Sequence, residues 1–307
     1  MVPIAQVNGR SRPSQAEPRR PMWLSWLFLA VYCLWLLGLK QLAIHAIPIV
    51  AVNFTEQILL AGFFVFHSLA YYSAIEVAFF AIACTVVSNV MENLSVISGF
   101  PFGYYYHTAL AGPKLFNVPI LVTFIYLGLG YVSWMVTQVL VRRTRFQSWS
   151  RLVFVAPLVA AFVFTSWDFC IDPIYGTIYR AFVYHSPGVW FGTPAGNYFG
   201  WLLTTYIFYL AFSLFLWGRG EAADIQRSAP GRRYWLQPVL MYAITAIGVV
   251  LANLNGPKLD VTVANGKVWN TGDIYGASTL ATIFTMGFIS LLALITLYAT
   301  NSVTEND

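Results

Sequence analysis

Three acidic residues stand out because they lie in or beside long apolar stretches, where an ionisable side chain is costly. Glu92 falls about two turns before the end of one such stretch, and Asp168 and Asp172 lie at the end of another. Asp168 and Asp172 are four residues apart, so they share a face if the helix continues between them. Two carboxyl groups this close do not both ionise, and one keeps its proton. Because a protonated, desolvated carboxylic acid suits general acid catalysis, we predict catalytic roles for Glu92, Asp168 and Asp172.

The same three acids also fit structural roles. Glu92 fits a carboxyl group that bonds to a neighbouring helix, and Asp168 fits a bond within a helix bundle. Asp172 fits the last residue of a helix, because Pro173 pushes the residue before it out of helical geometry. We therefore expect the helix that carries Asp168 to end at Asp172.

Two segments rich in aromatic residues, glycine and proline accompany the acids. Residues 98–107 read SGFPFGYYYH, and residues 184–201 read YHSPGVWFGTPAGNYFGW. Glycine and proline interrupt helices, so we expect both segments to fold back over the mouth of the bundle. An aromatic belt at the membrane interface is the structural alternative, and a helix cap is the alternative for Asn197. The residues that we predict to bind substrate are Asn93, Tyr104, Tyr106, Lys114, Trp167, Arg180, Trp190 and Asn197.

Membrane helices must position these residues. Of the 307 residues, 58% are apolar and 9% are charged, whereas soluble domains carry about 25% charged residues. The sequence predicts an all-α integral membrane protein, a bundle of about eight transmembrane helices. We expect residues 22–300 to form a single helical domain between a disordered polar tail, residues 1–21, and a short polar tail, residues 301–307. The predicted spans are residues 23–43, 54–72, 74–98, 115–141, 152–170, 198–217, 235–254 and 275–298.

The arginines predict which way the spans face. With eight spans, all three clusters of arginine fall at one end of the bundle, and this places the N- and C-termini in the cytoplasm. The acids and the aromatic segments then lie at the other end, together with residues 255–274, which suit a short hairpin. Basic residues scattered between apolar runs do not indicate a nucleic-acid partner. The clusters are Arg10, Arg12, Arg19 and Arg20; Arg142, Arg143, Arg145 and Arg151; and Arg219, Arg227, Arg232 and Arg233.

In their order and spacing, the acids and the aromatic segments resemble the carotenoid biosynthesis protein family, whose best-known members are membrane-bound carotenoid hydratases. The resemblance covers roughly residues 55–255. Residues 182–188 read FVYHSPG, where the family has a Trp-x-Trp stretch followed by acidic and glycine residues, and this difference bears on the substrate. The matching positions are Glu92, Gly99 to Tyr104, Gly112, Lys114, Val118, Pro119, Trp167, Asp168, Asp172, Pro173, Phe191, Gly192, Pro194, Asn197, Gly200 and Trp201.

The resemblance implies that water is added to the terminal double bond of an acyclic carotenoid. Asp168 or Asp172 would protonate the alkene, and Glu92 would set the protonation of that acid or position the water. Ring faces would stabilise the carbocation. The implied partners are a lipophilic isoprenoid and the lipid bilayer, with no metal or redox cofactor. The residues that would supply the ring faces are Tyr104, Tyr106, Trp167 and Trp190.

Other functions remain open. The same acids and rings suit a membrane terpene cyclase, in which an internal alkene captures the cation. A second form of cyclase would hold Mg²⁺ on a prenyl diphosphate through Glu92, Asp168 and Asp172, with Lys114 and Arg180 nearby, since Mg²⁺ prefers oxygen ligands. A third possibility is a non-catalytic membrane protein that binds an isoprenoid or lipid.

Overall fold

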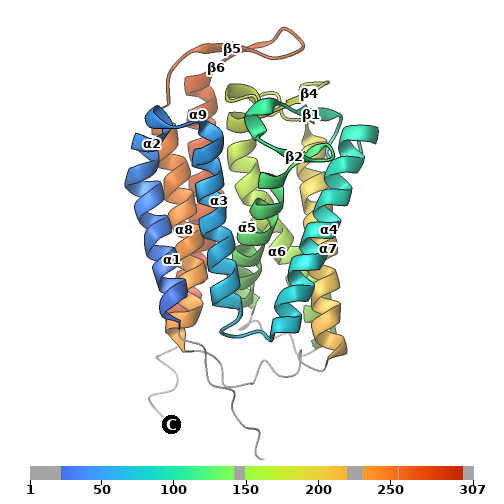
Figure 1. Ribbon diagram of the computed structural model, residues 1–307, viewed down its shortest axis with the longest axis vertical. Helices are drawn as coiled ribbons and strands as arrows, with labels where there is room; N and C mark the ends of the chain where they lie inside the picture. Colours follow the sequence, from blue (N-terminus) through green and yellow to red (C-terminus); the bar gives the residue numbers. More distant parts are fainter. Residues whose placement is uncertain (1–21, 142–148, 220–230, 255, 300–307) are drawn as a thin grey trace, which may run out of the picture.

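The computed structural model describes residues 22–141, 149–219, 231–254 and 256–299. Its helices run along one axis and form a single bundle (Figure 1). Within the described ranges, seven helices are long and apolar enough to cross a membrane, and Trp23–Leu39 is a shorter apolar helix. The predicted bundle of about eight helices is confirmed, and the chain is a multi-pass membrane protein. The predicted tails, residues 1–21 and 301–307, lie outside the described residues, as do most of the arginines.

Several crossings contain a π-helical turn, so one span comprises more than one element. The first crossing joins α1 (Trp23–Leu34), η1 (Trp35–Leu39) and α2 (Lys40–Ala46), and the last joins α9 (Thr271–Thr282), η5 (Ile283–Gly287) and α10 (Phe288–Tyr298). The crossings between them are α3 (Ile49–Ser68), α4 (Ala74–Ser98), α5 (Ile120–Val141), α6 (Trp149–Asp172) continued by η3 (Pro173–Ile178), α7 (Ala195–Gly218) and α8 (Arg232–Leu254).

Several predicted boundaries differ from the structure by a few residues, and proline is involved in two of these differences. Helix α3 begins at Ile49, not at residue 54, because Pro48 precedes it and proline suits the start of a helix. Helix α6 does not end at Asp172, which keeps helical angles, φ −55° and ψ −44°. The chain continues as the π-turn η3, in which Tyr179 N donates to Ile174 O, five residues earlier, at 2.9 Å. The wider π-turn accommodates the missing N–H of Pro173.

The predicted spans 54–72 and 74–98 leave room for only a short turn between them, and the structure has a short turn there. Helix α3 ends at Ser68 and α4 begins at Ala74. Ser73 caps α4 in a capping box, and its backbone N–H donates to Glu76 Oε2 at 2.7 Å. The two helices therefore run antiparallel, and α5 packs against both of them (Figure 1).

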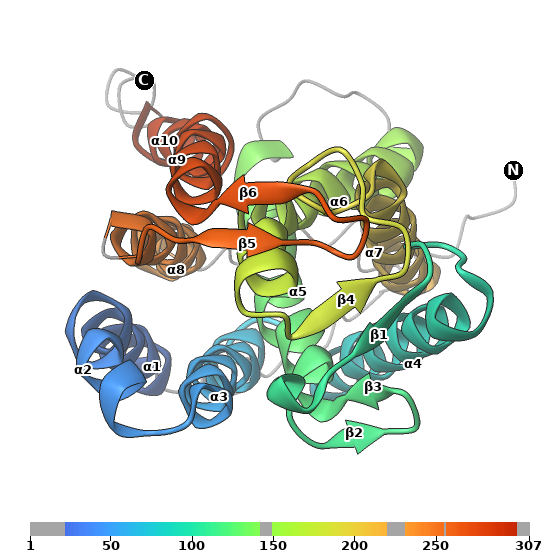
Figure 2. The ribbon, with the colours of Figure 1, turned by 90° about the horizontal axis from the view of Figure 1, so that it is seen from above.

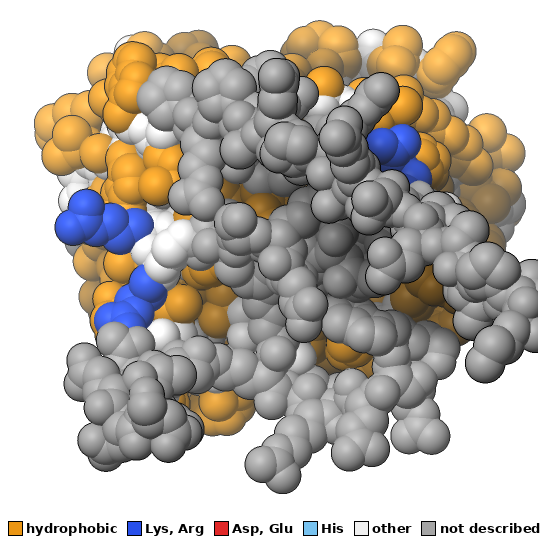
Figure 3. All heavy atoms as spheres, turned by 90° about the horizontal axis from the view of Figure 1, so that it is seen from below, with side chains coloured by type: hydrophobic (Ala, Val, Ile, Leu, Met, Phe, Trp, Pro, Cys, Tyr) orange, Lys and Arg blue, Asp and Glu red, His pale blue; other side chains and the backbone are white. Residues whose placement is uncertain are grey.

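Three small antiparallel ribbons cover one end of the bundle, which we call the ribbon end (Figures 1 and 2). They pair β1 (Tyr105–His107) with β4 (Phe182–Tyr184), β2 (Lys114–Leu115) with β3 (Val118–Pro119), and β5 (Asp260–Thr262) with β6 (Val268–Asn270). The last pair is the hairpin predicted within residues 255–274. At the opposite end, which we call the arginine end, Figure 3 shows Lys and Arg side chains beside the chain segments drawn in grey.

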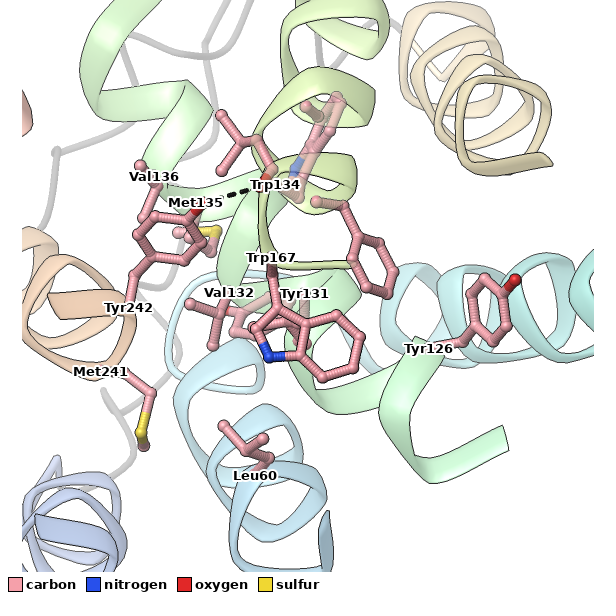
Figure 4. Close-up of a cluster of buried hydrophobic side chains, with 14 of the residues drawn as sticks. Leu60, Tyr126, Tyr131, Val132, Trp134, Met135, Val136, Trp167, Met241 and Tyr242 are labelled. Carbon is pink, nitrogen blue, oxygen red and sulfur yellow. Dashed lines mark hydrogen bonds between the residues drawn. The ribbon is translucent and has the colours of Figure 1, made fainter. Parts of the chain in front are cut away.

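Helix α5 lies at the centre of the bundle, with α1, α3 and α8 on one side and α4, α6 and α7 on the other (Figure 2). Gly128 allows α3 to approach α5 closely, since a Cβ built there would lie 2.6 Å from the Cβ of Leu60. Buried aromatic and aliphatic side chains fill the space around α5, among them Tyr126 and Trp167 (Figure 4). The carboxyl end of α6 and the first turns of α7 are thus held against a rigid centre.

Candidate active site

Asp168 and Asp172 meet Asn197 where the end of α6 packs against the start of α7. Both residues are buried: Asp168 is 1% exposed and Asp172 is 4% exposed. Asn197 Nδ2 donates to Asp168 Oδ2 at 3.0 Å and to Asp172 Oδ2 at 2.6 Å. Because both carboxyl groups bind the same amide nitrogen, they lie close together, and two buried carboxyl groups this close favour a state in which one of them keeps its proton. Because α7 begins at Ala195, Asn197 lies inside its first turn and binds the acids instead of capping the helix.

Glu92 of α4 lies close to this pair and accepts two phenol hydrogen bonds. Tyr105 of β1 donates to Glu92 Oε2, and Tyr126 of α5 donates to Glu92 Oε1 at 3.0 Å. The pKa of Tyr105 is raised well above its ordinary value, first by burial, then by the charge of Glu92, and to a smaller extent by the charges of Asp172 and Asp168. The structure therefore places Glu92 at the same end of the bundle as Asp168 and Asp172.

A stack of aromatic rings runs from the acid pair to Glu92. Trp167 precedes Asp168, and its ring lies 6.4 Å from that of Trp201. Trp201 stacks on Tyr126, with the ring centroids 4.7 Å apart and the planes 12° apart. All three rings are buried. Their faces offer the negative potential that attracts a cation.

A glycine-bounded turn between α4 and β1 aims Tyr105 at Glu92. Gly99 and Gly103 adopt φ angles of +80° and +101°, which glycine reaches without steric cost. Ser95 Oγ donates to Gly103 O at 2.8 Å and accepts from Phe102 N at 3.0 Å. The turn thus returns the chain across the end of α4, within reach of Glu92.

Strand alternation decides which tyrosine of residues 104–106 reaches the acids. Tyr105 pairs with Tyr184 of β4, and both side chains are buried. Successive strand residues point to opposite faces, so Tyr104 and Tyr106 point away and are 51% and 48% exposed. Their rings lie 6.3 Å and 5.7 Å from that of His185. The structure therefore does not bring Tyr104 and Tyr106, which we predicted as substrate-binding residues, to the acids.

Three other predicted residues support loops near the site, and hydrogen bonds join them to backbone atoms of those loops and of α6. Asn93 Oδ1 accepts from Asn117 N at 3.1 Å. Lys114 Nζ donates to His107 O at 2.5 Å. Trp190 stacks on Phe169 at 4.7 Å and donates to its carbonyl oxygen at 3.2 Å.

Arg180 lies at the ribbon end above the acids. It adopts φ +51° and donates from Nη2 to Thr262 O at 2.7 Å. With Tyr106, Thr177 and Tyr184 it lines a half-open hollow of about 220 Å³ between the β1–β4 and β5–β6 ribbons. Burial, and then the charges of Asp172 and Asp168, raise the pKa of Tyr184 well above its ordinary value. Tyr184 therefore borders the hollow and is also within the electrostatic influence of the acid pair.

Sequence reasoning did not single out several residues of the site. Tyr105 and Tyr126 bind Glu92, and His107 Nε2 lies 3.9 Å from Glu92 Oε2 in a buried position. The alternation of residues 104–107 as a strand was a usable signal for Tyr105 and His107, because both then face the bundle.

A second polar cluster, also missed, lies on the other side of η3. Lys40 Nζ contacts Glu56 Oε2 at 2.5 Å, and Tyr175 OH donates to Asn53 Oδ1 at 3.1 Å. Glu56 is an acid within an apolar span, which is itself a signal of function. The cluster ties the first crossing and α3 to the π-turn that follows Asp172.

The magnesium alternative requires three acids that share one ion. Among the described residues, no three His, Cys, Asp or Glu side chains are grouped so that they could hold a metal ion. Glu92, Asp168 and Asp172 are thus neighbours without forming such a set, and a magnesium requirement of the activity stays a prediction to be tested.

Comparison with known proteins adds one finding. A family model described as carotenoid biosynthesis protein matches residues 54–266. The matched range contains Glu92, the acid pair, Asn197 and the whole aromatic stack. No curated protein and no solved structure matches the chain.

Proposed function

The chain belongs to the carotenoid biosynthesis protein family and acts in carotenoid metabolism, and from this premise we propose that it adds water to a carbon–carbon double bond of an isoprenoid. The observation that carries the proposal is the buried acid pair, Asp168 and Asp172, which Asn197 holds beside the aromatic stack. A buried carboxyl pair with one proton between its members is a proton donor in a desolvated place.

The acid pair supplies the first step. The carboxyl group that holds the proton passes it to the less substituted carbon of the alkene, so a C–H bond forms and the π bond breaks. The positive charge develops on the more substituted carbon. The pair is doubly ionised only while the cation exists, and Asn197 donates to both members of it. This amide stabilises the charge that the step creates.

The rings and a water molecule complete the reaction. Trp167, Trp201 and Tyr126 present buried ring faces to the tertiary cation, an attraction worth about 2 kcal/mol or more for a desolvated ring. Water attacks the cation through oxygen, and the proton that it loses returns to the acid pair. The balance is one alkene and one water giving one tertiary alcohol.

The same first step serves a proton-initiated cyclase, so the product must decide between the two. The gene is expressed in a host that makes acyclic carotenoids, and extracts are compared by mass with those from the Asp168→Asn variant. We expect a product that has gained the mass of one water. A new hydrocarbon of unchanged mass would instead indicate cyclisation. Bound but unchanged isoprenoid would indicate a carrier.

A further inference from the structure

His107 is a buried polar side chain close to the site that the acid chemistry leaves unused. It is 7% exposed, and its Nε2 has no hydrogen-bond partner among the described residues. The nearest acid is Glu92, whose Oε2 lies 3.9 Å from Nε2, beyond the range of a direct hydrogen bond. A buried polar atom without a partner is costly, so this position calls for a ligand.

The surroundings of His107 suit one small polar molecule. Strand pairing opposite β4 turns His107 and Tyr105 to the same inner face, and Lys114 fixes the backbone through the carbonyl oxygen of His107. Each oxygen of Glu92 accepts a hydrogen bond from one phenol, and each carboxylate oxygen has a further lone pair. A water between His107 Nε2 and Glu92 Oε2 would bond to both, since polar atoms more than about 3.5 Å apart are commonly bridged in this way.

We propose that His107 and Glu92 bind the water molecule that attacks the carbocation, which makes His107 a catalytic residue. The proposal rests on the hydration chemistry proposed above, in which water is the second substrate, and it assigns a binding site to that water. Proton donor and water are then carried by different elements, α6 for the acid pair and α4 with β1 for the water. When the water attacks, the imidazole and the carboxylate are placed to take up its proton and relay it to the acid pair.

The experiment separates the protonation step from the attack of water. His107→Leu and His107→Gln are compared with wild type in D₂O, with His185→Leu as the matched control, because His185 is an exposed histidine on the neighbouring loop. For each variant, the alcohol and the deuterium content of the recovered alkene are measured per amount of folded protein. A cation that is not captured loses a proton to the carboxylate, so protonation without hydration leaves deuterium in the alkene.

For His107→Leu we expect at least a tenfold loss of alcohol while deuterium still enters the recovered alkene. His107→Gln keeps a donor and an acceptor and is expected to recover part of the alcohol, and His185→Leu should match wild type. The inference is overturned if His107→Leu makes as much alcohol per folded protein as wild type does. It is also overturned if the amount of alcohol and the deuterium content of the alkene fall together. If wild type makes no alcohol at all, the proposed hydration itself has failed.

Discussion

Asp172 and Tyr175 lie three residues apart in the chain, yet they bond to helices on different sides of the bundle. Asp172 accepts from Asn197 of α7 at 2.6 Å, whereas Tyr175 donates to Asn53 of α3 at 3.1 Å. In an α-helix, residues three apart share a face. The π-turn η3 begins between the two residues and rotates the chain by less at each residue, so the two side chains diverge. The π-turn is thus braced from α3 while it presents Asp172 to the acid site.

Removing this brace should affect the chemistry more than the fold. Tyr175→Phe loses one hydrogen bond, worth about 1 kcal/mol, and frees η3 to shift by fractions of an ångström. Such a shift misplaces Asp172, so we expect product formation to fall about tenfold. The control is Tyr32→Phe. It removes a buried hydrogen bond of 2.9 Å between Tyr32 OH and Thr245 Oγ1, and neither residue belongs to η3. Both variants should lose similar thermal stability, and equal activities in the two would contradict the brace.

The acid pair should be indispensable to the reaction. Asp168→Asn and Asp172→Asn each remove a carboxyl group while keeping size and hydrogen-bonding capacity. General acid catalysis contributes about 10²- to 10⁴-fold, so we expect at least a hundredfold loss of product in each. Product is measured in extracts and normalised to folded protein. Asp273→Asn changes an exposed acid at the same end of the bundle and should keep wild-type activity; full activity in both pair variants would rule out acid catalysis by this pair.

The two phenol bonds to Glu92 should contribute measurably to stability. Tyr126→Phe leaves a buried carboxylate oxygen without its donor at 3.0 Å, and a hydrogen bond to a charged group is worth about 2 kcal/mol. We expect Tyr126→Phe to lower the thermal midpoint in detergent. Tyr298→Phe, which removes an exposed hydroxyl but keeps the ring over which Arg232 lies, should not. An unchanged midpoint in Tyr126→Phe would mean that water replaces the phenol.

The large features of the fold follow from composition and periodicity. Apolar runs of about 20 residues can cross a bilayer only as helices, and this argument predicted the bundle and the hairpin turn before Ala74. The acids were predictable because a carboxyl group in an apolar span needs a reason to be there. The i, i+4 spacing placed Asp168 and Asp172 on one face, as the structure confirms.

The parts that sequence reasoning missed depend on geometry that spacing does not encode. Pro173 read as a helix end because the π-turn that tolerates it leaves no sequence signal of its own. The prediction named Tyr104 and Tyr106 and not Tyr105. Which of these rings faces inward is fixed by the pairing of β1 with β4, and this pairing joins segments about eighty residues apart in the sequence. The partner of Glu92 on α5, Tyr126, looks like any other aromatic residue in a span.

The orientation of the bundle in the membrane is testable with cysteine variants. We propose that the arginine end faces the cytoplasm, because positive charge is retained on that side. Ala264→Cys places an exposed thiol at the ribbon end, and Gly231→Cys places one at the arginine end. In intact cells, a membrane-impermeant thiol reagent should label the first and not the second, and lysis should expose both. Wild type gives the background from Cys33, Cys84 and Cys170, of which the last two are buried; the reverse labelling would invert the topology.

Two glycines in the first turns of α7 offer a matched test of the turn that precedes β1. A Cβ built on Gly200 would lie 2.8 Å from the carbonyl oxygen of Pro101 and 2.9 Å from its carbonyl carbon, whereas one built on Gly196 meets no described atom within 4 Å. Gly200→Ala must therefore displace the turn between Gly99 and Gly103, and with it Tyr105 and its bond to Glu92. We expect a lower thermal midpoint and a loss of product of at least tenfold.

Gly196→Ala should be neutral or stabilising, because alanine favours a helix over glycine by about 1 kcal/mol. For each variant, the thermal midpoint and the amount of product are measured on one and the same membrane preparation. If Gly200→Ala keeps wild-type activity, the turn can move without disturbing Tyr105, and the position of that tyrosine must be fixed by its pairing with β4 alone.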